Sequence, residues 1–214
     1  MIKNIIFDFG GVIYDIDHNL SKIAFEKLGV ENFEQLYGHH IQIEKFEEFD
    51  RGELPEKNFI DYLKTFLPKN TTDQQIIFAW NALLLGFEKE KIDFVESLAE
   101  YYKIFVLSNT NILHHRQFIE ELYTYKNFHD IFEDVWFSHE VGMRKPESRI
   151  YHSLLEKHQL KADESLFIDD LEKNIIGAKE VGLETYFLHN EDIRNLFEEG
   201  RLKMELLKNS PNFS

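Results

Sequence analysis

Residues 5–14 read IIFDFGGVIY, an apolar run that delivers one carboxylate and then breaks on two glycines. The opening residues have the composition of a buried strand, and Asp8 stands where that strand ends. Removing a carboxylate from water is costly unless a cation or several hydrogen-bond donors receive it. We therefore expect Asp8 to serve as a metal ligand or as a nucleophile.

The composition sets wide limits around this stretch. The chain has 214 residues, 43% of them hydrophobic, which suffices for one large core or a core with a small appended domain. Its 24 basic and 39 acidic residues give a formal net charge of −15, which would repel nucleic acid and anionic lipid. No apolar run approaches the roughly 18 residues of a membrane span, and no secretory signal pattern opens the chain. We expect a cytoplasmic protein, monomeric by default, without nucleic-acid or membrane partners.

Cysteine is absent, which excludes disulfides, a thiolate zinc site and a cysteine nucleophile. The ten histidines are scattered, and none of them forms an H-E-x-x-H motif. Neighbours such as His114 and His115 point in different directions on a helix. We expect no zinc site, and we place most histidines on solvated helix surfaces.

The segment that follows the opening stretch is helical in pattern. Apolar side chains recur at helical spacing from Leu20 to about Phe87, and the breaks between helices carry Gly29, Pro55 and Pro68. No strand pattern interrupts these residues, so we expect an all-helical subdomain over 15–88. Trp80 and the phenylalanines should form its core.

From residue 89 onward, short apolar runs alternate with helical patterns. Strands are expected at 103–107, 134–138, 165–168 and 184–188, with helices between them. Pro146 should open the helix that carries Ile150 and Leu154, one last helix should cover 193–207, and residues 209–214 read as a loose tail. The alternation predicts an α/β fold with a Rossmann-like parallel sheet and helices on both faces, built from 1–14 and 89–214.

In such a sheet the carboxyl ends of the strands line one crevice where ligands bind. The strand ends here carry Asp8, Ser108, the loop with Lys145, and the pair Asp169 and Asp170. Clustered carboxylates repel one another unless a cation lies between them, and oxygen ligands of this kind suit Mg²⁺. A hard metal, a hydroxyl and a fixed positive charge around one carboxylate are what phosphoryl transfer requires.

Each of these residues taken alone has an ordinary explanation. Asp169, Asp170 and Ser108 are all residue types that cap helices. Four such features, each following its own strand of one sheet, favour a common site over four unrelated caps.

The ordered motifs resemble those of the haloacid dehalogenase superfamily, whose helical cap is inserted after the first strand. The residues that carry the resemblance are Asp8-Phe9-Gly10-Gly11-Val12, Leu107-Ser108-Asn109, Gly142-Met143-Arg144-Lys145-Pro146 and Asp169-Asp170 with Asn174. In detail the chain is similar to the bacterial sugar phosphatases that include alpha-D-glucose-1-phosphate phosphatase. The resemblance implies a Mg²⁺-dependent phosphatase that acts on a small phosphorylated metabolite.

The resemblance also implies roles for individual residues. Asp8 would be the nucleophile that forms an aspartyl-phosphate intermediate and also a Mg²⁺ ligand, together with the Gly10 carbonyl, Asp169 and Asp170. The groups that would contact the phosphate or substrate are Gly10, Gly11, Ser108, Asn109 and Lys145. Asn174 would support Lys145 or the acidic pair.

Gly10 departs from the pattern, because most phosphatases of this superfamily carry a second aspartate there as general acid and base. Such assistance contributes roughly 10²- to 10⁴-fold to rate. Without it we expect slower turnover or substrates with good leaving groups, such as a sugar 1-phosphate. Tyr14, Asp15, Asp17 or an acidic residue of the cap could take over this role.

Three other classes remain open. Dehalogenases of the superfamily also lack the second aspartate, but they attack carbon without a metal and have no need of the acidic pair. A receiver domain would place its acidic pair on the first strand and has no helical insertion. A protein that binds a phosphorylated ligand with little turnover would share the same crevice residues.

Overall fold

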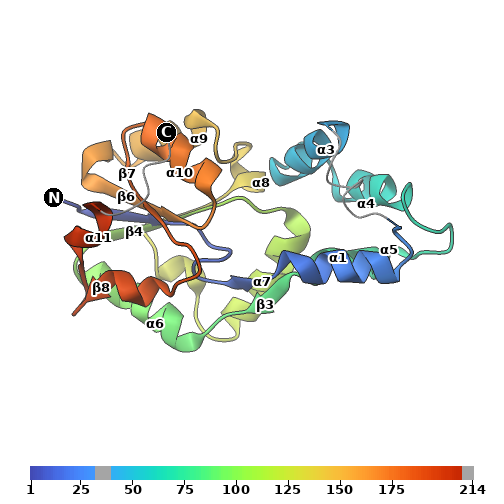
Figure 1. Cartoon of the computed structure of the whole chain (residues 1–214), viewed down its shortest axis with the longest axis horizontal. Helices are drawn as coiled ribbons and strands as arrows, with labels where there is room; N and C mark the ends of the chain where they lie inside the picture. Colours follow the sequence, from blue (N-terminus) through green and yellow to red (C-terminus); the bar gives the residue numbers. More distant parts are fainter. Residues whose placement is uncertain (32–39, 209–214) are drawn as a thin grey trace.

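The computed structural model describes residues 1–31 and 40–208, and its centre is a five-stranded parallel sheet (Figure 1). The strand order is β5-β4-β1-β6-β7, so the opening strand lies in the middle of the sheet. The strands are β1 (Asn4–Phe7), β4 (Lys103–Ser108), β5 (Asp134–Phe137), β6 (Ser165–Asp169) and β7 (Glu184–Phe187). This confirms the expected α/β class and four of the expected strand positions to within a residue or so.

Side chains of the central strands alternate between two hydrophobic layers, as the twofold period of a strand requires. Ile5 and Phe7 of β1 join one buried cluster, whereas Ile6 joins the other. Because both layers are apolar, the strand reads in sequence as a continuous hydrophobic run. The register pairs Phe7 with Val106 and with Ile168, which brings the ends of three strands level.

Helices cover both faces of the sheet. α6 (Lys89–Ser97) and α7 (Ile112–Tyr123) pack on one face, and α9 (Ser148–Lys157) and α10 (Glu172–Glu180) on the other (Figure 1). Their apolar positions recur every three or four residues and point towards the sheet. The short helical elements are η1 (Leu98–Glu100), η2 (Phe128–Asp130), α8 (Ser138–Val141) and η3 (Ala162–Glu164).

Four helices beside the sheet surround a third hydrophobic cluster, to which Leu113 of α7 also contributes (Figure 1). They are α1 (His18–Lys27), α3 (His40–Asp50), α4 (Glu56–Lys64) and α5 (Asp73–Asn81). Thr72 caps α5 through a reciprocal pair with Gln75. Trp80 lies in this cluster with Phe46 and Phe59, as expected for core residues.

The expectation that no strand interrupts the helical segment is wrong. β2 (Asp15–Ile16) and β3 (Leu84–Gly86) pair as a small antiparallel ribbon where the chain enters and leaves the helices. Two- and three-residue strands are too short to show an alternating pattern in sequence. The division into 1–14 with 89–214 and 15–88 stays a prediction, and the ribbon lies at both of its boundaries.

Two further expectations need correction. Pro146 does not open a helix, because α9 begins at Ser148 with Glu147 as its N-cap residue. The single last helix is instead η4 (Ile193–Leu196), a hairpin of β8 (Phe197–Glu198) and β9 (Arg201–Leu202), and α11 (Met204–Lys208). The turn of that hairpin contains Gly200 with positive φ, which breaks the helical path. The predicted tail, residues 209–214, lies outside the described residues.

No helix within 1–31 and 40–208 has the length and apolar character needed to span a bilayer.

Candidate active site

A cavity of about 410 Å³ opens at the carboxyl ends of β1, β4 and β6, beneath the helices α3 and α5. Predicted site residues that line it are Asp8, Gly10, Asn109, Lys145, Asp170 and Asn174. The expected convergence of strand ends on one crevice is therefore found. Three predicted residues, Gly11, Ser108 and Asp169, are not among its described lining.

Lys145 is fully buried and bridges two of the predicted carboxylates. Its Nζ lies 2.7 Å from Asp8 Oδ1 and 2.7 Å from Asp169 Oδ2. The Phe9 backbone N–H also donates to Asp8 Oδ1, at 2.7 Å. These bonds orient the Asp8 carboxylate and, among the described residues, use only one of its two oxygens.

The two adjacent aspartates have different surroundings. Asp169 is fully buried and both its oxygens accept hydrogen bonds, from Lys145 Nζ, Leu171 N and Asn174 Nδ2. Asp170 is partly exposed and lines the cavity, and its carboxylate interacts with its own backbone N–H. Asp169 thus anchors the lysine, while Asp170 presents its carboxylate to the cavity.

The electrostatics favour a divalent cation between these groups. Asp8, Asp169 and Asp170 each offer an oxygen within 4.8 Å of the others, and Lys145 offsets only one of the three charges. Burial raises the pKa of Asp8 to about 8, with the Lys145 charge opposing and Asp169 and Asp170 adding to the shift. Burial and the Asp169 charge likewise raise the pKa of Asp170 to about 6. For Lys145, burial lowers the pKa but the two carboxylates outweigh it, so the ammonium is retained.

Gly11 allows Asp170 to approach the opening stretch. It has φ of +79°, and a Cβ at this position would lie 2.3 Å from Asp170 Oδ2. Any side chain there would both strain the backbone and displace the carboxylate. The oxygen-rich donor set, held this closely, fits the ligand preference of Mg²⁺.

Asn109, which follows β4, forms hydrogen bonds with the backbone of Lys145. Asn109 Nδ2 donates to the Lys145 carbonyl at 2.8 Å, and Asn109 Oδ1 accepts from the Lys145 N–H at 2.8 Å. The side chain expected to contact substrate therefore holds the lysine loop in place. Ser108 is the last residue of β4, directly precedes Asn109 in the chain and is buried.

The absence of an aspartate at position 10 is built into the local packing. A Cβ on Gly10 would lie 3.3 Å from Ile16 Cδ1, so the Ile16 side chain occupies the space that a longer side chain would need. β2 holds Ile16 there by pairing with Leu84 of β3. The departure at Gly10 and the unexpected ribbon are thus parts of one arrangement.

Three of the groups that could replace the missing aspartate have other partners. Tyr14 donates its hydroxyl to Glu121 Oε2 at 2.5 Å, and Asp15 pairs with Lys91 at 2.7 Å. The Asp17 side chain accepts from the Asn19 N–H at 2.9 Å as the N-cap of α1. The remaining option, an acidic residue of the helical segment, is met by two carboxylates on α3.

Those carboxylates, Glu47 and Asp50, line the cavity together with Arg144 and were not expected individually from the sequence. Arg144 Nη1 lies 2.7 Å from Glu47 Oε1, and Nη2 lies 3.5 Å from Asp50 Oδ2. Burial raises the pKa of Asp50, against the opposing Arg144 charge. The available signals were the two acids one turn apart on an expected helix and the arginine next to Lys145.

Trp80 and His114 form a stacked wall of the same cavity. Their ring centroids lie 5.1 Å apart with an interplanar angle of 8°, and His114 Nε2 lies 3.2 Å from the Trp80 carbonyl. Burial lowers the pKa of His114 to about 4, with the Trp80 carbonyl opposing. The imidazole is therefore neutral over the physiological range.

This shift predicts a pH-dependent stability. Between the ordinary pKa of 6.5 and about 4, the unfolded chain binds a proton at His114 and the folded chain does not, so the free energy of unfolding decreases as the pH is lowered. From about pH 7 to about pH 5 this single group should cost the wild type roughly 1 to 2 kcal/mol. In urea unfolding at both pH values, the free energy of unfolding of His114→Gln should decrease between about pH 7 and about pH 5 by that much less than the free energy of the wild type does. An equal loss in both proteins would contradict the assignment.

Comparison with known proteins agrees with this geometry. The model of the haloacid dehalogenase-like hydrolase family matches residues 2–182. The chain belongs to this family. It is 31% identical over 188 residues to a D-ribitol-5-phosphate phosphatase of Bacteroides thetaiotaomicron, covering 87% of this chain and 91% of that one.

Solved structures of the family share the fold. A HAD family enzyme from Bacteroides thetaiotaomicron, in complex with magnesium and inorganic phosphate, superposes with a TM-score of 0.83 at 33% identity, covering 92% of this chain and 100% of that one. A HAD-like family hydrolase from Porphyromonas gingivalis gives 0.77 at 29% identity, covering 90% and 94%.

Proposed function

We propose that this member of the family is a Mg²⁺-dependent phosphatase that hydrolyses a small phosphorylated sugar or polyol through an aspartyl phosphate on Asp8. The observation that carries the proposal is the buried lysine shared by Asp8 and Asp169, next to a third carboxylate at the base of one cavity. The similarity to a D-ribitol-5-phosphate phosphatase, and to an enzyme solved with magnesium and phosphate, supports it.

Asp8, Asp170 and the Gly10 carbonyl are the groups that would hold the ion, with Asp169 occupied mainly by Lys145 and Asn174. When bound, Mg²⁺ neutralises charge on the carboxylates and on the phosphoryl oxygens. Lys145 adds a fixed positive charge at the same place, because two carboxylates keep it protonated.

The chemical step uses the carboxylate of Asp8. One oxygen attacks phosphorus while the bond to the substrate oxygen breaks, which gives an acyl phosphate and an alcohol. Water then attacks the acyl phosphate, releases inorganic phosphate and restores the carboxylate. The departing oxygen takes a proton, which we assign to Asp50, whose raised pKa suits a donor.

The lining of the cavity supports a polyhydroxylated substrate. The Arg144 charge is already paired with Glu47 and faces Asp50, so this group does not attract a second anion and instead offers acceptors and donors to hydroxyl groups. The wall of Trp80 suits the apolar face of a sugar or carbon chain. Sugar 1-phosphates, expected from the departure at Gly10, and polyol phosphates both belong to this class.

A panel of phosphate esters tests the proposal. With Mg²⁺ we expect release of phosphate from p-nitrophenyl phosphate and faster release from some sugar or polyol phosphates, with D-ribitol 5-phosphate, sugar 1-phosphates and 6-phosphates included. Excess chelator should lower turnover by at least about 10²-fold, since carboxylate repulsion and phosphoryl charge are then unopposed. Full turnover in chelator, or halide release from 2-haloacids, would contradict the proposal. Retained phosphate binding without turnover would favour the binding-protein alternative.

A further inference from the structure

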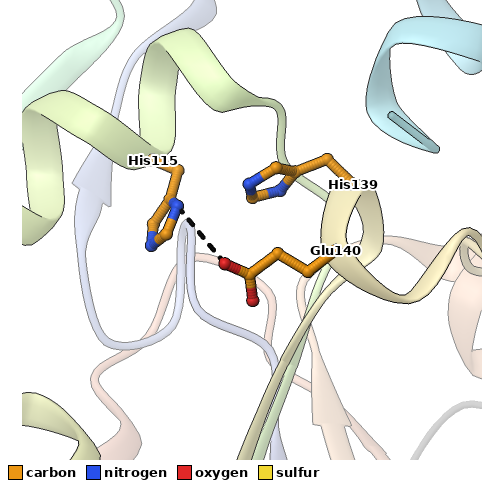
Figure 2. Close-up of side chains that lie close together, drawn as sticks. All are labelled: His115, His139 and Glu140. Atoms are coloured by element: carbon orange, nitrogen blue, oxygen red, sulfur yellow. Dashed lines mark ion pairs between the residues drawn. The ribbon is translucent and has the colours of Figure 1, made fainter. Parts of the chain in front are cut away.

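A second cluster of ligand-type side chains lies apart from the phosphoryl site. His115 projects from α7, and His139 and Glu140 project from α8, so that the three side chains face one another (Figure 2). None of them is among the described lining of the 410 Å³ cavity. The proposed phosphatase mechanism uses none of these residues.

The three groups are close enough to share one ion. Each offers a ligand atom, and these atoms all lie within 4.8 Å of one another. His115 Nδ1 is already 3.8 Å from Glu140 Oε1, the pair marked in Figure 2, and the two imidazole centroids are 5.0 Å apart. Ligand atoms around a tetrahedral zinc ion lie about 3.4 Å apart, because each bond is about 2.1 Å. Glu140 is 47% exposed, so its arm can close the remaining distance by rotation.

The two imidazoles are in the protonation state that binds metals. Burial lowers the pKa of His115 and of His139 to about 4, so both rings are neutral near pH 7. Within the described residues, Nε2 of His115 and both ring nitrogens of His139 are buried without a hydrogen bond of good geometry, although the Thr110 backbone interacts with the His139 ring. Leaving such nitrogens buried and unpaired is unfavourable, and bonding to a cation would relieve that cost.

We propose that His115, His139 and Glu140 bind a zinc ion, with water in the fourth position. Two imidazoles and one carboxylate form a zinc-type ligand set, whereas Mg²⁺ prefers oxygen ligands throughout. The site is separate from the carboxylate cluster in both position and chemistry.

The ion would join the two segments that carry the second and third motifs. α7 begins just after Asn109, and α8 ends just before the loop with Lys145. Thr110 and Ser138 already connect these segments by reciprocal hydrogen bonds of 2.9 and 2.8 Å. Because neither motif residue contacts the ion, it would act on the phosphoryl site only through the two segments that it joins, and its binding should raise the thermal stability of the chain.

Zinc titration of the metal-free protein, with Mg²⁺ in excess to occupy the carboxylate site, tests the proposal. Calorimetry should find one Zn²⁺ per chain, thermal unfolding should move to higher temperature, and Co²⁺ in place of Zn²⁺ should give the visible absorption of a tetrahedral nitrogen and oxygen site. His115→Gln and Glu140→Gln should each weaken Zn²⁺ binding by at least about 10-fold. Glu140 is exposed, so its variant keeps the fold even if a histidine variant does not.

Two controls locate the site. His152→Gln alters an exposed histidine on α9, and Asp170→Asn alters the carboxylate cluster, and both should retain full Zn²⁺ affinity. Undiminished affinity in both His115→Gln and Glu140→Gln would overturn the proposal. So would loss of Zn²⁺ binding in Asp170→Asn, because the ion would then belong to the phosphoryl site.

Discussion

Asp8→Asn should abolish phosphatase turnover, with a loss of at least about 10³-fold in kcat. The amide preserves the shape of the side chain but cannot attack phosphorus. The fold should survive, since burial and two neighbouring carboxylates already disfavour the charge at this position. Folding stability should therefore be unchanged or slightly higher.

Steady-state kinetics with Mg²⁺, combined with thermal unfolding, measures both effects. Asp163→Asn is a matched control, because Asp163 is exposed on η3, before the amino end of β6, whereas Asp169 lies at the carboxyl end of that strand. Acid-quenched wild type should carry a phosphoryl group on Asp8, and the variant should not. Turnover near the wild-type rate in Asp8→Asn would refute its role as nucleophile.

Lys145→Met should damage both stability and catalysis. The substitution keeps the volume but leaves Asp8 and Asp169 facing each other without the ammonium that now lies 2.7 Å from each. Removing one partner of a buried ion pair costs about 3 to 5 kcal/mol. Loss of the positive charge beside the phosphoryl group should lower kcat by about 10²- to 10³-fold.

A double variant separates the two effects. If Lys145 stabilises the fold by neutralising Asp8, then Asp8→Asn combined with Lys145→Met should be more stable than the sum of the two single changes in the free energy of unfolding predicts. Lys161→Met makes the same substitution at an exposed lysine and should change neither the stability nor kcat. Strictly additive losses in the double variant would show that Lys145 stabilises the fold by some other route.

Much of the sheet could be predicted because its signals are local. The apolar runs at 103–107 and 165–168 are continuous, since helices cover both faces of these strands. The two-residue strands β2, β8 and β9 could not be predicted in this way, because a pattern needs several residues to be visible. The last helix was overestimated for a related reason, since its apolar spacing continues across a hairpin turn at Gly200.

At the site, the residue types and their convergence could be predicted, but the contacts that each residue makes could not. Asp169 and Asp170 are equivalent in sequence, and only the positions of Asn174 and Lys145 make one an anchor and the other a cavity group. Asn109 lines the cavity, as a residue expected to contact substrate would, and its amide also holds the backbone of Lys145, which the sequence did not indicate. The contacts of a side chain depend on neighbours distant in sequence, which no local pattern specifies.

The sequence by itself determined that a carboxylate ends a buried strand, that the chain is α/β, and that three further strand ends bring donors and acids to the same edge. These follow from the periodicity of apolar residues and from the geometry of parallel sheets. Tertiary structure alone decided that Ile16 fills the space beside Gly10, that α3 supplies Glu47 and Asp50, and that His115 meets His139. Each of these contacts joins segments that are distant in the chain or meet only across a turn, and packing in three dimensions, rather than local spacing, selects them.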